Sequence, residues 1–195
     1  MANLKRFLTP KSIAIYGGSW AMNVIEQLQI SKYNGEIWPV HPNRSDIGGI
    51  KCFADTQSLP GVPDAAFIGV NRELSVEIIG ELNSIDAGGA ICFASGYREA
   101  NEEHQIKNSG YLDLQDQLVS AAGNMPMLGP NCYGYLNYLD NVTLWPDQHG
   151  GHQVDKGVAI IAQSSNVAIN MTMQQRGLSV AALCTVGNQA CVGLN

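Results

Sequence analysis

Residues 12–24, SIAIYGGSWAMNV, join an apolar strand-like run to a helical pattern through two glycines. Glycine lets a backbone approach a phosphate closely, and the first turn of a helix offers free N–H groups and partial positive charge. Gly17, Gly18, Ser19 and Trp20 are therefore candidate phosphate-binding residues. The alternative is an ordinary strand–helix turn without a ligand. The third glycine of the GxGxxG fingerprint of dinucleotide-binding domains is absent.

A cation follows the second apolar run, in the string IWPVHPNR. An NAD-binding domain usually carries an acidic residue near this position, where it binds the ribose. Arg44 instead suits an additional phosphate on the ribose, as in NADP or coenzyme A. A solvated loop arginine is the alternative interpretation.

Small and polar residues follow the next two apolar runs, in the strings IGVNREL and CFASGYRE. Ligands of open α/β sheets bind beyond the carboxyl ends of the strands, which meet at one edge. The candidates at this edge are Asn71, Arg72, Ala94, Ser95 and Gly96. Close packing of small side chains without a ligand is the alternative.

A second strand–helix joint lies in the string IIAQSSNVA. Its hydroxyl and amide groups, on Gln163, Ser164, Ser165 and Asn166, together with free backbone N–H groups, suit an anion. Simple capping of the helix is the alternative.

Two further motifs are weaker signals. Cys132, in GPNCYGYLN, has no accompanying base, so a buried thiol is favoured over a nucleophile. Asp147, His149 and His152, in DQHGGH, have spacing that is poorly specific for zinc. We therefore predict neither a catalytic residue nor a metal site in this chain.

Five apolar runs, at residues 12–16, 36–40, 65–70, 90–94 and 125–128, alternate with helical patterns. This alternation predicts an α/β fold with a Rossmann-like, doubly wound, mostly parallel sheet over residues 1–130. Residues 131–156 lack a helical period and are expected to form an ordered connector. A strand–helix–strand pattern then begins at residue 157. One such unit is too small to stand alone, so residues 157–195 are expected to be the truncated start of another domain.

Composition excludes some classes of protein. A formal net charge of −6 argues against a nucleic-acid-binding surface, which is normally basic. No apolar run reaches the roughly 20 residues that span a bilayer, so no membrane partner is expected. The five cysteines show no CxxC pairing, which favours reduced thiols and a cytoplasmic protein.

The ordered strings SIAIYGGS, GEIWPVHPN, DAAFIGV, GAICFASGYRE, GPNCYGYLN, GVAIIAQSSNVA and TVGNQA cover nearly the whole chain. In this order they resemble the N-terminal part of the NDP-forming acyl-CoA synthetases, which are related to the succinyl-CoA synthetase α subunit. The resemblance implies a CoA-binding domain followed by an incomplete, flavodoxin-like βαβ unit that begins the ligase domain.

The resemblance also assigns roles to residues. Gly17, Gly18, Ser19 and Trp20 would hold the phosphates of CoA, and Arg44 would meet its nucleotide end. The pantetheine and adenine crevice would be lined by Phe93, Ala94 and Ser95 and bordered by Val70, Asn71 and Arg72. Gln163, Ser164, Ser165 and Asn166 would form a helix terminus that faces the phosphorylated intermediate. Ser165, Asn71 and the bulky Trp20 depart from the family pattern.

Enzymes of this family carry phosphate on a histidine and bind ATP or GTP with magnesium in an ATP-grasp domain. Neither part is expected in this chain, which is therefore predicted to bind CoA without turnover. An ATP-grasp domain or subunit is the expected partner, and self-association through an exposed apolar surface stays open. The alternatives are an NADP-binding redox module and a non-catalytic CoA-binding sensor or scaffold.

Overall fold

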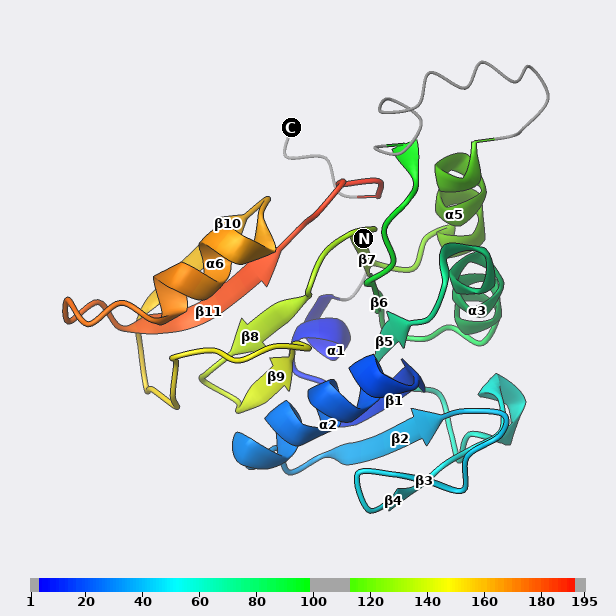
Figure 1. Cartoon of the computed structure of the whole chain (residues 1–195), viewed down its shortest axis with the longest axis horizontal. Coiled ribbons are helices and arrows are strands. Elements are labelled where there is room, and N and C mark those ends of the chain that lie inside the picture. Colours follow the sequence, from blue (N-terminus) through cyan, green and yellow to red (C-terminus); the bar gives the residue numbers. More distant parts are fainter. Residues whose placement is uncertain (1–3, 99–112, 192–195) are drawn as a thin grey trace.

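The computed structural model describes residues 4–98 and 113–191, and these residues carry a five-stranded and a four-stranded sheet (Figure 1). The five-stranded sheet is parallel throughout, as the uninterrupted apolar runs predicted. In spatial order its strands are β2 (Glu36–Val40), β1 (Ser12–Gly17), β5 (Ala65–Gly69), β6 (Ala90–Cys92) and β7 (Met127–Leu128). The α/β class and the doubly wound sheet are confirmed.

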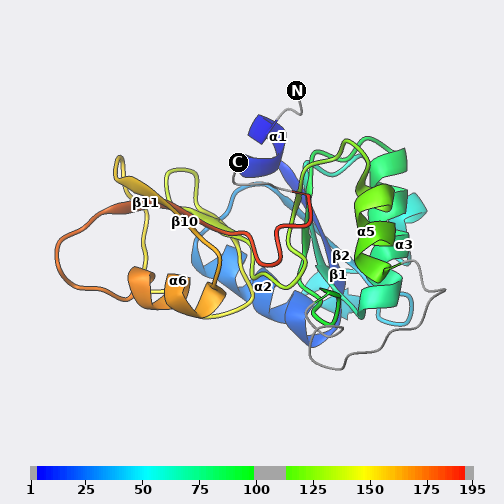
Figure 2. The same cartoon turned by 90° about the horizontal axis from the view of Figure 1, so that it is seen from above.

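Helices cover both faces of this sheet (Figure 2). Alternate residues of β1 point in opposite directions, so Ile13 and Ile15 pack in one core cluster, whereas Ala14 and Tyr16 pack in another. Helix α2 (Ser19–Ile30) contributes its buried apolar residues to the first cluster. Helices α3 (Arg72–Ser84) and α5 (Leu114–Ala122) contribute theirs to the second.

The strand order reverses direction between β1 and β5. The chain leaves β1 toward β2 on one side and later returns to β5 on the other side. Gly17 and Gly69 face each other where these two strands end. A Cβ on Gly17, whose φ is +126°, would lie 2.5 Å from the Gly69 carbonyl oxygen, so only glycine fits here.

The second sheet contains the predicted strand–helix–strand unit, formed by β10 (Val158–Ala162), α6 (Ser165–Thr172) and β11 (Val180–Thr185). It also contains two strands that the sequence pattern did not indicate, β8 (Tyr135–Asn137) and β9 (Val142–Leu144). These lie within the stretch expected to be a connector. Strand β8 pairs antiparallel with β11, and β9 pairs antiparallel with β8. The domain boundaries given above stay a prediction.

Helices α1 (Leu4–Leu8) and α2 link the two sheets. Phe7 of α1 packs edge-on against Tyr135 of β8, with ring centroids 5.4 Å apart, and its carbonyl accepts a hydrogen bond from the Tyr135 hydroxyl. At the end of α2, the Ser31 hydroxyl lies 3.0 Å from the Asn141 carbonyl. The first core cluster accordingly contains residues from both sheets.

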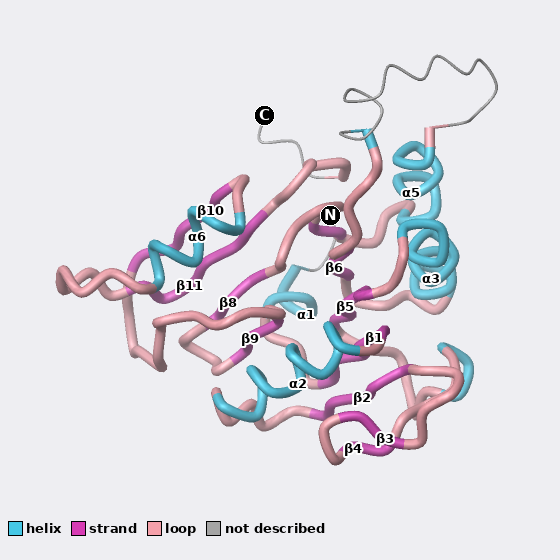
Figure 3. The backbone as a smooth tube through the Cα atoms, in the orientation of Figure 1, coloured by secondary structure: helices cyan, strands magenta, loops and turns pink. Residues whose placement is uncertain are grey.

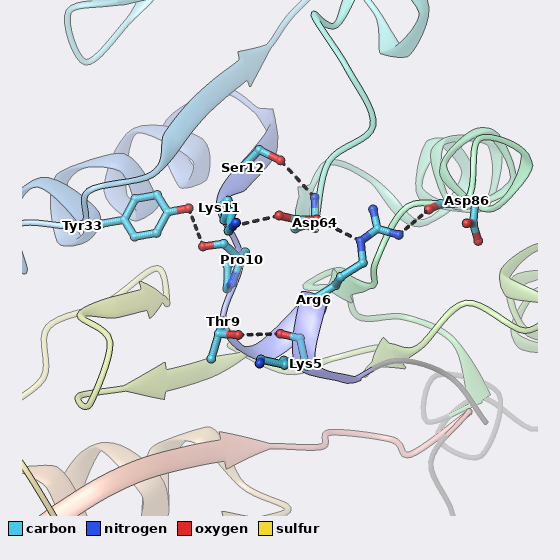
Figure 4. A network of polar contacts seen from close by, with 9 residues as sticks. All are labelled: Lys5, Arg6, Thr9, Pro10, Lys11, Ser12, Tyr33, Asp64 and Asp86. Carbon is cyan, nitrogen blue, oxygen red and sulfur yellow. Dashed lines mark hydrogen bonds and ion pairs between the residues drawn. The ribbon is translucent and has the colours of Figure 1, made fainter.

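A polar network closes the amino ends of β1 and β5 (Figure 4). One Asp64 carboxylate oxygen lies 2.9 Å from Arg6 Nε, and the other accepts a hydrogen bond from the Lys11 backbone N–H at 2.9 Å. The Asp64 backbone N–H donates to the Ser12 hydroxyl, and Arg6 Nη1 donates to the Asp86 carbonyl. These bonds fix α1 to the end of the sheet opposite the glycine pair.

The short elements β3 (Asp46–Ile47), β4 (Ile50–Lys51) and η1 (Thr56–Ser58) fill the connection from β2 to β5. Within residues 4–98 and 113–191, no helix is long and apolar enough to cross a membrane.

The glycine pair predicts a specific pattern of stability. Gly17→Ala should lower the free energy of unfolding by about 3 kcal/mol, because it adds both a strained φ and a backbone clash. Gly49→Ala, at φ +78° with nothing within 4 Å of the added Cβ, should cost only about 1 kcal/mol. Urea unfolding followed by circular dichroism measures both, and equal losses would contradict the close approach at Gly17.

Candidate functional site

A cleft of about 1050 Å³ opens at the carboxyl edge of the parallel sheet and extends to the start of α6. Figure 3 shows the loops that follow β5 and β6 at this edge. The cleft brings together most of the residues that the sequence predicted. These are Trp20, Val70, Asn71, Arg72, Phe93, Ala94, Ser95, Gln163, Ser164, Ser165 and Asn166.

Five other predicted residues, Gly17, Gly18, Ser19, Arg44 and Gly96, do not line this cleft. Gly17 ends β1, Gly18 and Ser19 begin α2, and Arg44 and Gly96 lie in the loops after β2 and β6. Gly17 contacts Gly69, which does line it. A Cβ on Gly18 would lie 3.6 Å from Arg44 Nη2, so the guanidinium reaches the start of α2. The predicted residues therefore form a row along the sheet edge, with Arg44 at one end and α6 at the other.

Helix α2 begins without a side-chain cap, because its N-cap residue is Gly18. By contrast, Asn71 caps α3, and its Oδ1 accepts a hydrogen bond from the Leu74 N–H at 2.9 Å. Ser164 caps α6 through a longer bond of 3.4 Å from the Val167 N–H. The first turn of α2 therefore keeps N–H groups that can bind an anion.

Arg72 fixes the loop that follows β6. Its Nη1 donates a hydrogen bond to the Gly96 carbonyl, and its Nε lies 2.8 Å from the Glu73 carboxylate. The buried Tyr97 hydroxyl donates to the Arg72 carbonyl at 3.1 Å. The loops after β5 and β6 are thus joined by Arg72, which the resemblance placed only at the border of the crevice, and by Tyr97.

Two of the residues predicted near an anion at α6 also hold loops together. The Ser165 hydroxyl accepts a hydrogen bond from the Tyr133 N–H at 3.1 Å, and Gln163 Nε2 donates to the Gly187 carbonyl at 3.2 Å. The Asn188 N–H donates to the Pro130 carbonyl at 2.9 Å. The GPNC and VGNQA motifs, far apart in sequence, therefore meet at the cleft.

Five residues that line the cleft were not predicted from the sequence, namely Gly69, Glu73, Asn131, Cys132 and Tyr133. The string GPNCYGYLN carried a family signal, but its spacing did not reveal that it follows β7 at the same edge. Cys132 is buried, and this burial raises the pKa of its thiol well above the usual value. A thiol that stays protonated is a poor nucleophile, in agreement with the interpretation of Cys132 as a packed residue.

Aromatic rings line one part of the cleft. Trp20 packs on Phe93 with ring centroids 4.7 Å apart, and Phe93 lies 5.7 Å from Tyr133. Trp20 nevertheless remains 42% exposed. The bulky indole therefore neither fills the cleft nor lies in the core.

His149, in the weak metal motif, is bound to another side chain of the protein rather than directed at a metal site. Its Nδ1 lies 3.0 Å from the Tyr138 hydroxyl, and its buried Nε2 has no hydrogen-bond partner among the described residues. Burial lowers the pKa of His149. In the part of the chain that the structure describes, no group of three His, Cys, Asp or Glu side chains could hold a metal ion.

A cleft at the carboxyl edge, beside the point where the strand order reverses, is the nucleotide-binding arrangement of doubly wound α/β proteins. Comparison with known proteins gives the particular family. Residues 11–138 match the family model described as a CoA binding domain, and the chain belongs to that family.

The relatives of the chain are CoA ligases. Over 98% of its length it is 28% identical to a trans-feruloyl-CoA synthase from an unknown prokaryotic organism. Over 96% it is 26% identical to an ADP-forming acetate–CoA ligase of Methanocaldococcus jannaschii. A solved structure of acetyl-coenzyme A synthetase 1 from Ca. Korarchaeum cryptofilum, described as dinucleotide forming, matches 98% of the chain with a TM-score of 0.82 at 24% identity, which shows the fold.

These matches confirm the resemblance to the CoA-binding part of NDP-forming acyl-CoA synthetases. The chain spans 28% of the length of the feruloyl-CoA synthase and 26% of the length of the acetate–CoA ligase. It spans 41% of the length of the acetyl-coenzyme A synthetase in the solved structure.

The environment of His149 predicts a pH effect. The lowered pKa means that the unfolded state binds a proton more readily than the folded state below about pH 6.5. The free energy of unfolding should therefore fall as the pH decreases from 7.5 to 5.5, with a contribution of at most about 1.4 kcal/mol per pH unit from this residue. His149→Gln should flatten this slope in urea unfolding. An unchanged slope in this variant would contradict the assignment.

Proposed function

We propose that this chain binds coenzyme A along the carboxyl edge of its parallel sheet, as the CoA-binding part of an NDP-forming acyl-CoA ligase. The observation that carries the proposal is the continuous row from Arg44, across the uncapped start of α2, into the cleft. Its length suits an elongated ligand that is charged at one end.

The charges along this row match the chemistry of CoA. The diphosphate binds at Gly17–Trp20, where the N–H groups of α2 and the missing side chain of Gly18 accommodate it. Arg44 binds the phosphate on the ribose. This guanidinium is available, because the ion pairs among the described residues involve Arg6, Arg72 and Arg98 instead.

The pantetheine arm follows the cleft past Val70–Arg72 and Phe93–Ser95. Its thiol end then lies near α6, where Gln163–Asn166 face the phosphorylated group of the complete enzyme. The side chains of Gln163 and Ser165 position this terminus, since both are engaged with the neighbouring loops. The backbone N–H groups of α6 then provide the contact with the anion.

The complete reaction converts an acid, CoA and a nucleoside triphosphate into acyl-CoA, a nucleoside diphosphate and phosphate, through a phosphohistidine. We assign to this chain the binding and orientation of CoA, without turnover. The ligase domain of the complete enzyme supplies the histidine, and an ATP-grasp domain or partner subunit supplies ATP or GTP with magnesium. This division agrees with the small share of each relative that the chain spans.

The same proposal places the CoA-binding domain at residues 1–130 and the start of the ligase domain at residues 157–195. It also places the protein in the cytoplasm, where its five free cysteines would stay reduced.

Arg44→Ala tests the position of the ribose phosphate. The change should weaken CoA binding about tenfold, since it removes a charge-assisted hydrogen bond to a phosphate. Binding of 3′-dephospho-CoA, which lacks that phosphate, should be the same in both proteins. Isothermal titration calorimetry measures the dissociation constants, with Arg176→Ala as a control on another exposed arginine.

Two outcomes contradict the proposal. The first is no binding of CoA by the unmodified chain at millimolar concentration. The second is binding of NADP but not CoA, which would favour a redox module. If CoA binds but the chain adds nothing to ligase activity when combined with an ATP-grasp partner, a sensor or scaffold is favoured.

Ser19→Asp separates folding from binding. A carboxylate in the first turn of α2 interacts favourably with the helix dipole, so the free energy of unfolding should stay constant or rise by about 0.5 kcal/mol. The same charge repels phosphate, so CoA should bind at least about tenfold more weakly. Thermal unfolding and calorimetry on one sample give both values, and Ser19→Ala is the uncharged control. Unchanged CoA affinity in Ser19→Asp would place the phosphates elsewhere.

A further inference from the structure

The side chain of Trp20 leaves the first turn of α2 along the carboxyl edge of the parallel sheet, toward β5. Its Cβ lies 3.1 Å from where a Cβ on Gly69 would be, so the bare backbone of Gly69 makes room for it. The indole then packs on Phe93, which follows β6, with ring centroids 4.7 Å apart. The backbone of the first turn and the indole therefore serve neighbouring but different parts of this edge.

Neighbouring rings hold the indole in a defined position. Phe93 lies 5.6 Å from the buried Phe67 and 5.7 Å from Tyr133, which packs edge-on against the buried Trp145. Trp20 lines the cleft and keeps 42% of its surface exposed. A side chain that is already held in place loses little conformational freedom when a ligand covers it.

The order of the chemical groups in CoA matches this arrangement. The proposed function places the diphosphate on the N–H groups at the start of α2, and the pantetheine arm leaves it toward Val70–Arg72 and Phe93–Ser95. The unit of the arm that is joined directly to the diphosphate is pantoate, which carries a pair of methyl groups on one carbon. These methyl groups are the first apolar part of the ligand beyond the diphosphate. The indole is the first apolar side chain of the cleft beyond the start of α2 in the same direction.

We propose that the indole of Trp20 binds the methyl groups of pantoate and thereby selects CoA over nucleotides that lack the pantetheine arm. The inference rests on the proposed function and refines it, because the backbone of the first turn binds the diphosphate while the side chain binds the group that follows. Contact between the methyl groups and the indole removes apolar surface of both from water. NADP carries a ribose beyond its diphosphate, and the ribose hydroxyls would lose water on this surface without gaining a hydrogen bond. Trp20 is thus a specificity-determining residue.

Adenine is another part of CoA that stacks on indole rings, so the experiment compares two ligands that share the same adenosine. CoA and adenosine 3′-phosphate 5′-diphosphate, which is CoA without its pantetheine arm, are titrated in a calorimeter. The proteins are the unmodified chain, Trp20→Ala and Trp20→Leu. Met22→Ala, which changes an exposed apolar residue of the same helix outside the cleft, is the matched control.

Trp20→Ala should weaken the binding of CoA about tenfold, because the methyl groups and the lost indole no longer cover each other. The same variant should change the dissociation constant of the nucleotide by less than about twofold, which also shows that the site is still folded. Trp20→Leu should weaken CoA binding only about threefold, since burial of apolar surface does not require a ring. Met22→Ala should bind both ligands as the unmodified chain does.

Three results overturn the inference, and they differ from one another. An equal loss of affinity for both ligands in Trp20→Ala assigns the indole to adenosine or to the diphosphate. Unchanged affinity of Trp20→Ala for CoA rejects any contact with the ligand, while leaving the CoA site intact. No binding of CoA by the unmodified chain rejects the proposed function itself.

Discussion

The contact between Gly17 and Gly69 is the constraint on which the rest of the binding edge depends. The Gly69 carbonyl oxygen lies where a side chain on residue 17 would be. Because Gly17 has no side chain, β1 and β5 stay paired up to their last residues. Because the chain leaves these two strands in opposite directions, the loops diverge at this point. The start of α2 and the cleft-lining residues after β5 are both placed by this divergence.

The two ends of the sheet distribute their polar groups in opposite ways. At the amino ends, the Asp64 carboxylate pairs with Arg6 and accepts a hydrogen bond from the Lys11 backbone N–H, so α1 is anchored. At the carboxyl ends, the N-cap of α2 has no side chain and Arg44 forms none of the ion pairs found among the described residues. The ion pair that anchors α1 therefore lies at the amino edge of the sheet, whereas the groups that can bind an anion lie at its carboxyl edge.

The parallel sheet could be predicted because each strand is a continuous apolar run that is buried on both faces. Strands β8 and β9 could not, since each has three residues within a segment rich in glycine and asparagine. The pairing of β8 with β11 and of β9 with β8 is set by tertiary contacts. The cleft was predicted from the rule that carboxyl ends share an edge. Asn131 and Tyr133 were not predicted to line the cleft, because no helical pattern follows β7 to mark where this strand ends.

The residues near α6 show why residue type alone does not define a ligand contact. Ser165 and Gln163 carry groups that suit an anion, yet the structure uses both to join loops from distant parts of the chain. Such bonds fix the position of the helix terminus relative to β6, where Ala94 also accepts a hydrogen bond from the Asn131 N–H. The proposed binding of CoA from α2 to α6 requires the two ends of the site to be held at a constant separation. The second sheet, packed on α2 and tied to the loop after β7, supplies this rigidity, so its folding and the geometry of the cleft are coupled.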